Sequence, residues 1–173
     1  MTIPEIVRQG ALLGIATLLT AVLAYAAVND VRERKIPNWT VLTCLGLFVA
    51  WAVFHPLNWD LWALGAGVVA FLITFGLYMG GVIGAGDSKL FAAVALFTGM
   101  GQLAILALAT AVIGGVVAIA GFLIRPTRGL VMLKMRGRGD FGRGVPYGVA
   151  IALASGALVW AAALGAHLPG YPG

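Results

Sequence analysis

Long apolar runs alternate with short polar breaks along the first half of the chain. The apolar runs extend from Gly10 to Val28, from Trp39 to Phe54 and from Leu61 to Met79. A helix needs about 20 apolar residues to cross a hydrocarbon core about 30 Å thick, and these runs approach that length. They lack the alternating, roughly ten-residue pattern of a membrane β-barrel strand. The pattern therefore predicts three membrane helices in this half.

The second half contains a longer apolar run, from Leu90 to Ile124. As one helix it would be about 52 Å long, which is too long for a single crossing. Basic residues flank both ends of this run, so an even number of crossings fits best. We expect the break at residues 99–102 (GMGQ), although a break within 109–115 would give more equal lengths. A last helix is predicted from Val145 to Ala166, which makes about six in all.

The composition supports an all-α, polytopic membrane bundle. Hydrophobic residues make up 61% of the 173 residues and charged residues only 10%, and the mean hydropathy is +1.01. Such a chain has too little polar surface for a soluble domain, and we expect residues 1–173 to form one membrane-embedded domain. The single cysteine, Cys44, is expected to be a small buried hydrophobe, and no metal site or cofactor is expected.

The basic residues predict the orientation of the chain in the membrane. In the six-helix arrangement, ten of the eleven Lys and Arg residues lie on one face, and only Arg8 lies on the other. By the positive-inside rule, that face is cytoplasmic and both termini are extracytoplasmic. The net charge of +5 is therefore assigned to topology and to membrane lipid rather than to nucleic acid. The ten residues are Arg32, Arg34, Lys35, Lys89, Arg125, Arg128, Lys134, Arg136, Arg138 and Arg143.

Two acids stand beside apolar runs at the predicted cytoplasmic end. Asp30 follows the first run, and Asp87 precedes the fourth within GVIGAGDSKL. An ionisable group at a membrane edge is costly unless it is paired, hydrated or used, so the two together suggest paired-carboxylate chemistry. Each also has a purely structural interpretation. Asp87 can cap its helix, and Asp30 can pair with Arg32 or Arg34 in a solvated loop.

These residues carry a specific resemblance. Asp30 followed by RKIPN at 34–38, together with GAGDSK at 84–89, resembles the two signatures of type IV prepilin peptidases, the GxGD class of membrane aspartyl proteases. Residues 145–148 (VPYG) resemble a Pro-aromatic-Gly element found late in that family. The resemblance covers nearly the whole chain and implies a membrane peptidase that uses Asp30 and Asp87 as its catalytic pair.

Further residues are expected to shape the site or to bind substrate. Glycines at positions 84 and 86 allow a positive φ and a close approach of backbone to substrate. Prolines are expected to set helix entry angles, and Tyr147 to line the cleft. Lys89 either orients Asp87 or only marks the cytoplasmic side. The full set is Gly84, Gly86, Lys89, Pro37, Asn38, Pro146 and Tyr147.

The resemblance also suggests a branch of the family. Larger members carry a four-cysteine zinc module and methylate the new pilin N-terminus, whereas this chain has one cysteine. It is similar to the small, peptidase-only branch of tight-adherence (Flp-type) pilus systems. The expected activity is cleavage of the short basic leader from prepilins at the cytoplasmic face of the inner membrane. The alternatives are a proton-coupled transporter that uses the same two carboxylates and a noncatalytic assembly subunit.

Overall fold

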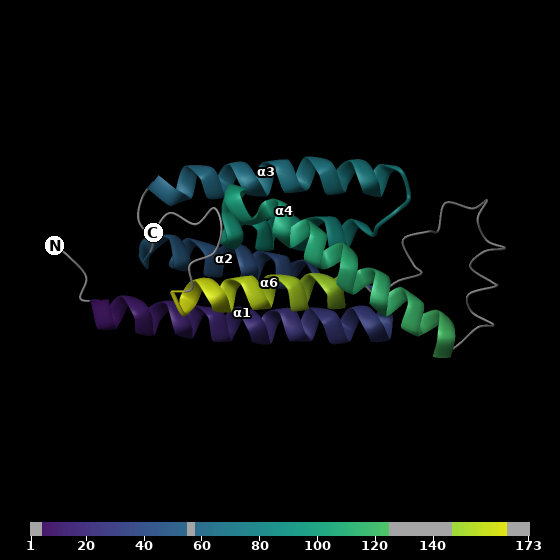
Figure 1. Ribbon diagram of the computed structural model, residues 1–173, viewed down its shortest axis with the longest axis horizontal. Coiled ribbons are helices and arrows are strands. Elements are labelled where there is room, and N and C mark those ends of the chain that lie inside the picture. Colours follow the sequence, from purple (N-terminus) through teal and green to yellow (C-terminus); the bar gives the residue numbers. More distant parts are fainter. Residues whose placement is uncertain (1–4, 55–57, 125–146, 166–173) are drawn as a thin grey trace.

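The computed structural model describes residues 5–54, 58–124 and 147–165. Every secondary-structure element in these ranges is an α-helix, which confirms the predicted all-helical bundle. Figure 1 shows most of the helices lying side by side along the long axis of the molecule. The helices are α1 (Glu5–Glu33), α2 (Asn38–Phe54), α3 (Asn58–Met79), α4 (Ala85–Ile124) and α6 (Tyr147–Ala163).

Three described segments are long and apolar enough to cross a membrane. They are α1, residues 61–79 of α3 and residues 85–121 of α4. The other two helices, α2 and α6, are apolar but have 17 residues each. Leu61, Val68 and Leu72 are among the many large apolar side chains that α3 exposes. Outward-facing leucine and valine in such numbers suit contact with lipid rather than with water. The chain is therefore a helical membrane protein.

The long α4 is broken at Gly99, as the GMGQ sequence predicts. Gly99 has φ 67° and ψ 178°, a conformation that only glycine adopts readily. The part before the break runs antiparallel to α3, with Ser88 hydrogen-bonded to Thr74 and Leu96 beside Gly67. The part after it runs back, so that Gly114 lies against Tyr147 at the start of α6 (Figure 1). The chain reverses direction at Gly99, and the alternative break within 109–115 is not observed.

Two helices extend further than their apolar runs. The first run ends at Val28, yet α1 continues to Glu33. The fourth run begins at Leu90, yet α4 begins at Ala85. Polar residues are compatible with helical backbone, so hydropathy marks where a helix leaves the apolar region and not where it ends. As a result, Asp30 and Asp87 lie inside helical turns and not in the connections between helices.

The core lies where α4 meets its neighbours. This helix packs against α2, α3 and α6, while α1 packs against α2 and α6. Phe97 of α4 is fully buried and makes edge-on ring contacts with Phe48 and Trp51 of α2, with centroids 5.6 and 5.8 Å apart. Cys44 is also fully buried, as predicted. This packing fixes the amino-terminal half of α4, which carries Asp87.

Candidate active site

Asp30 lies in the last turn of α1 and is buried, with 6% of its surface exposed. Its Oδ2 accepts a hydrogen bond of 2.9 Å from the backbone N–H of Gly148, in the first turn of α6. A Cβ on Gly148 would lie 2.9 Å from the same oxygen, so any larger residue would force the carboxylate or α6 to shift. The interpretation of Asp30 as a residue of a solvated loop is therefore wrong. Its carboxylate is held between α1 and α6.

Asp87 occupies the third position of α4 and is also 6% exposed. Its Oδ2 accepts a hydrogen bond of 3.2 Å from the N–H of Gly84, which precedes the helix. An acid at this position that reaches back to the preceding N–H is one half of a capping box. Asp87 thus does cap its helix, although it lies inside the first turn. Its other oxygen, Oδ1, is buried and has no hydrogen-bond partner among the described residues.

A buried hydroxyl pair joins the turn that carries Asp87 to α3. Ser88 Oγ donates to Thr74 Oγ1 at 3.0 Å, and Thr74 Oγ1 donates to its own helix at Ala70 O, 2.7 Å away. Successive helical residues point about 100° apart. With Ser88 held against α3, the preceding Asp87 points away from that helix.

Residues 34–37, here called the strap, connect α1 to α2 and contact both acid-bearing helices. At its start, Arg34 has φ 56°, and its N–H donates to Asp30 O at 3.0 Å, which closes α1 with a left-handed C-cap. Next, Lys35 O accepts a hydrogen bond of 2.8 Å from the Asn29 side chain. At its end, Pro37 O accepts both the N–H and the hydroxyl of Thr40 in the first turn of α2.

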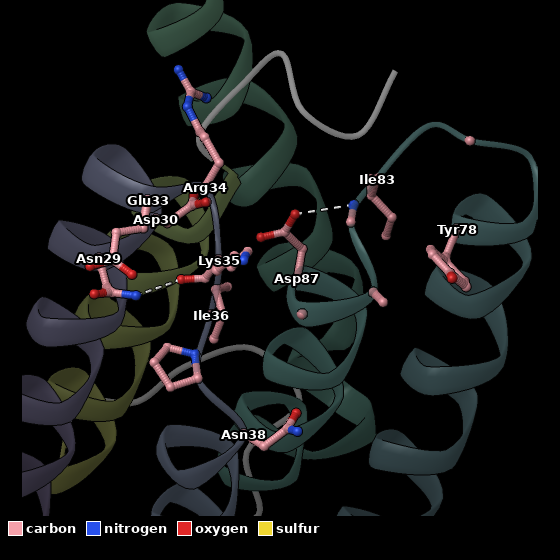
Figure 2. A pocket seen from close by; sticks show the side chains of 15 residues that line it. Asn29, Asp30, Glu33, Arg34, Lys35, Ile36, Asn38, Tyr78, Ile83 and Asp87 are labelled. Carbon is pink, nitrogen blue, oxygen red and sulfur yellow. Dashed lines mark hydrogen bonds between the residues drawn. The ribbon is translucent and has the colours of Figure 1, made fainter. Parts of the chain in front are cut away.

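The two carboxylates line one pocket of about 700 Å³. Asp30 is close enough for its charge to act on Asp87. Figure 2 shows the strap passing between the end of α1 and the start of α4, with the Asp87 side chain directed toward it. The lining residues are Asn29, Asp30, Glu33, Arg34, Lys35, Ile36, Pro37, Asn38, Tyr78, Gly81, Ile83, Gly84, Ala85, Gly86 and Asp87.

The structure brings together most of the site residues expected from the sequence. Pro37, Asn38, Gly84 and Gly86 line the same pocket as the two acids. By contrast, Lys89 is exposed and is not among the lining residues, so it fits the simpler role of marking the polar end of the bundle.

Two of the expected site residues lie at the start of α6 or just before it. Tyr147 is not among the residues that line the pocket in the described part of the chain; its ring packs against Gly114, where an added Cβ would lie 3.4 Å away. Pro146 lies outside the described residues.

The expected backbone role of the two signature glycines is corrected. Neither Gly84 nor Gly86 has a positive φ; among the described glycines near the pocket, that conformation occurs at Gly81 (φ 72°). Gly86 does permit a close approach, but the approaching group is the chain's own Ile36. A Cβ on Gly86 would lie 3.0 Å from the Ile36 Cβ.

Three important residues were not predicted. Asn29 and Gly148 were passed over because their roles come from hydrogen bonds to residues elsewhere in the fold. The available signals were weak: Asn29 is a polar residue beside Asp30, and Gly148 closes the VPYG stretch. Tyr78, at the end of the apolar run of α3, carries no comparable signal.

The geometry supports acid–base chemistry by a carboxylate pair. Each acid keeps one oxygen on a backbone N–H, and Asp87 has a second oxygen without a partner among the described residues. Polar atoms that are buried and unsatisfied are rare in proteins and often mark functional groups. A pair of close carboxylates can share one proton, which leaves one base and one acid in the same pocket.

Comparison with known proteins identifies the family of the chain. No curated protein and no solved structure matches the chain. The model of the type IV leader peptidase family matches residues 17–119, which is more than half of the chain and includes both Asp30 and Asp87. The chain therefore belongs to the type IV leader peptidase family.

Proposed function

We propose that this protein is a membrane aspartyl endopeptidase that removes the short basic leader from prepilins of the Flp type. The observation that carries the proposal is the pair of buried carboxylates, Asp30 from α1 and Asp87 from α4, on one pocket. Membership of the leader peptidase family supports a protease role for that pair. The pocket volume lies within the range of about 300–1,000 Å³ that is common for ligand sites.

The proposed mechanism uses the two acids in opposite protonation states. The ionised carboxylate takes a proton from a water molecule, and the oxygen of that water attacks the carbonyl carbon of the scissile peptide bond. The protonated carboxylate donates its proton to the carbonyl oxygen. As the C–N bond then breaks, the carboxyl group that took the proton from water passes it to the leaving amine, and the diol hydroxyl returns a proton to the other carboxylate. Because one acid has to be ionised and the other protonated, cleavage should decline at both low and high pH.

The position of the site suits a substrate that is itself anchored in a membrane. Asp30 is in the last turn of α1 and Asp87 in the first turn of α4, so the pocket opens at one end of the apolar bundle. A bond just outside the apolar segment of a pilin precursor would reach such a site. The basic residues that favour a cytoplasmic location include Arg34 and Lys35, which line the pocket.

The test is cleavage of a prepilin that has a short basic leader ending in glycine. The protein is co-expressed with that precursor, and the N-terminus of the product is sequenced. We expect cleavage after the glycine, with no methyl group on the new N-terminus even when S-adenosylmethionine is supplied. Intact precursor in the presence of correctly inserted protein would refute the peptidase, and a methylated product would refute the peptidase-only branch.

A further inference from the structure

The strap holds α1 by two hydrogen bonds within its first two residues. The Arg34 N–H donates to Asp30 O at 3.0 Å, and the Asn29 amide donates to Lys35 O at 2.8 Å. Arg34 adopts φ 56°, a conformation that is uncommon for a residue with a Cβ. The bond from Asn29 holds the carbonyl of the next residue, Lys35. Without it, the backbone would be free to relax toward a more ordinary conformation.

The other side of the strap packs tightly against α4. An added Cβ on Gly86 would lie 3.0 Å from the Cβ of Ile36 and 3.5 Å from its backbone nitrogen. The glycine therefore lets the first turn of α4 lie directly against the strap backbone. Gly86 directly precedes Asp87, while Asn29 directly precedes Asp30. Each attachment point of the strap thus adjoins one acid of the pair.

The strap is the link between the two acid-bearing turns. Elsewhere, α1 packs chiefly on α2 and α6, and α4 packs on α2, α3 and α6. The ends of α1 and α4 thus meet through the strap that lies between them (Figure 2).

We infer that the strap is a fixed spacer for the carboxylate pair, and that Asn29 is the positioning residue that holds it to α1. The inference rests on the proposed function, because the spacing matters for catalysis only if the two acids act together. It assigns Asn29 no contact with the reacting atoms. Its effect passes through Lys35 O and Ile36 to the separation of the two acids.

The kinetic test compares Asn29→Ala with a matched control. Asn29→Ala removes the amide donor, and we expect kcat for prepilin cleavage to fall roughly 10- to 100-fold because reacting groups are misplaced. KM should change less than about threefold, since the effect is not on substrate binding. The pH range of activity should shift, because the spacing governs how the pair shares its proton. Asn29→Gln, which keeps the donor, should recover part of the loss.

The control is Thr43→Ala on α2. It also removes a side-chain hydrogen bond of 2.8 Å to a backbone carbonyl, but that bond lies within α2 and does not involve the strap. We expect wild-type kinetics for this variant. A wild-type kcat and pH range in Asn29→Ala would overturn the inference. A rise in KM with an unchanged kcat would also overturn it, because Asn29 would then be a substrate contact. A fall in the unfolding temperature that accounts for the lower rate would do the same.

A distance measurement tests the spacer without any cleavage. Spin labels are placed at exposed Arg32 and Lys89 after replacing buried Cys44 with alanine. We expect one narrow distance distribution in the parent and a wider or shifted one when Asn29 is Ala or Asp, the latter being a near-isostere without the donor. Unchanged distributions in both variants would refute the spacer. If Asp87→Asn still cleaves prepilin, the proposed function fails, while this measurement still decides the inference.

Discussion

Each acid of the site is held by a backbone N–H that comes from a different part of the chain. Gly148 donates to Asp30 and Gly84 donates to Asp87, through Oδ2 in both cases. A carboxylate that accepts backbone N–H bonds keeps its orientation even when its charge changes. The pair is therefore positioned before substrate arrives, which is the arrangement that acid–base catalysis needs.

The first residue-scale prediction concerns the carboxylates themselves. Asp30→Asn and Asp87→Asn preserve shape but remove ionisation, so each should lower the rate of leader cleavage by roughly 10³-fold or more. The double variant should be about as inactive as either single one, because the two groups act as a unit. The control is Asp140→Asn, an acid in the basic connection that lies outside the described residues. Substantial cleavage by either dyad variant would exclude the aspartyl mechanism.

The second residue-scale prediction concerns Gly148. In Gly148→Ala the added Cβ would lie 2.9 Å from Asp30 Oδ2 and 3.0 Å from its Cβ, so the side chain or α6 has to shift. We expect a loss of activity of up to about 100-fold and a stability cost of about 1–3 kcal/mol, measured by cleavage and by thermal unfolding. Gly156→Ala on the same helix meets nothing within 4 Å and should behave like the parent. Equal behaviour of the two variants would contradict the close packing at Asp30.

At the scale of elements, the amino-terminal half of α4 is fixed by specific contacts on two sides. Gly86 lies against the strap, and Ser88 is hydrogen-bonded to Thr74 of α3. Interhelical hydrogen bonds in membranes are worth about 0.6 kcal/mol on average. The hydroxyl pair is therefore a modest contributor to stability, and its value lies in setting the rotation of α4.

The hydrogen bond between Ser88 and Thr74 predicts a measurable energetic coupling between these two residues. In a double-mutant cycle of Thr74→Val and Ser88→Ala, the unfolding free energies should be non-additive by roughly 0.5–1.5 kcal/mol. Thr43→Val serves as the control, because the hydroxyl of Thr43 bonds to the carbonyl of Trp39 in its own helix and not to another described helix. Combined with Ser88→Ala it should give additive effects. Additivity in both cycles would mean that the bond between Ser88 and Thr74 contributes nothing.

The elements also show which features a sequence can reveal. The break of α4 was predictable because an apolar run too long for one crossing has to turn, and the glycine at position 99 permits the conformation that the turn requires. The apolar runs stop short of the ends of α1 and α4 because polar residues such as Glu33 and Ser88 continue a helix beyond its apolar stretch. Hydropathy contains no signal for that continuation.

At the scale of the whole molecule, the pairing of Asp30 with Asp87 was predictable from the sequence. The contacts that hold the two acids in place were not. Both acids adjoin apolar runs, which drew attention to them in the sequence. The bond to Asp30 from Gly148 spans 118 residues of chain and depends on how α6 packs on α1. The role of Asn29 likewise depends on the path of the strap. Such contacts are properties of the folded bundle and not of any local pattern.

The whole-molecule prediction concerns orientation. Reporter fusions after Asp60 and at the C-terminus should report an extracytoplasmic location, and fusions near Arg34, Ser88 and Gly139 a cytoplasmic one. The reason is the concentration of ten of the eleven basic residues on one predicted face. A cytoplasmic C-terminus would refute the arrangement with six crossings.

The hydrogen bonds from Gly84 and Gly148 have a consequence for how such a protein can change. A main-chain N–H remains when the side chain of its residue changes. Most substitutions elsewhere therefore leave the hydrogen bonds to the two acids in place. The exposed side chains of Glu33 and Lys35 border the same pocket and do not supply either of these hydrogen bonds. Under the proposed function, preference for one leader over another can therefore diverge at this rim while the carboxylate pair stays the same.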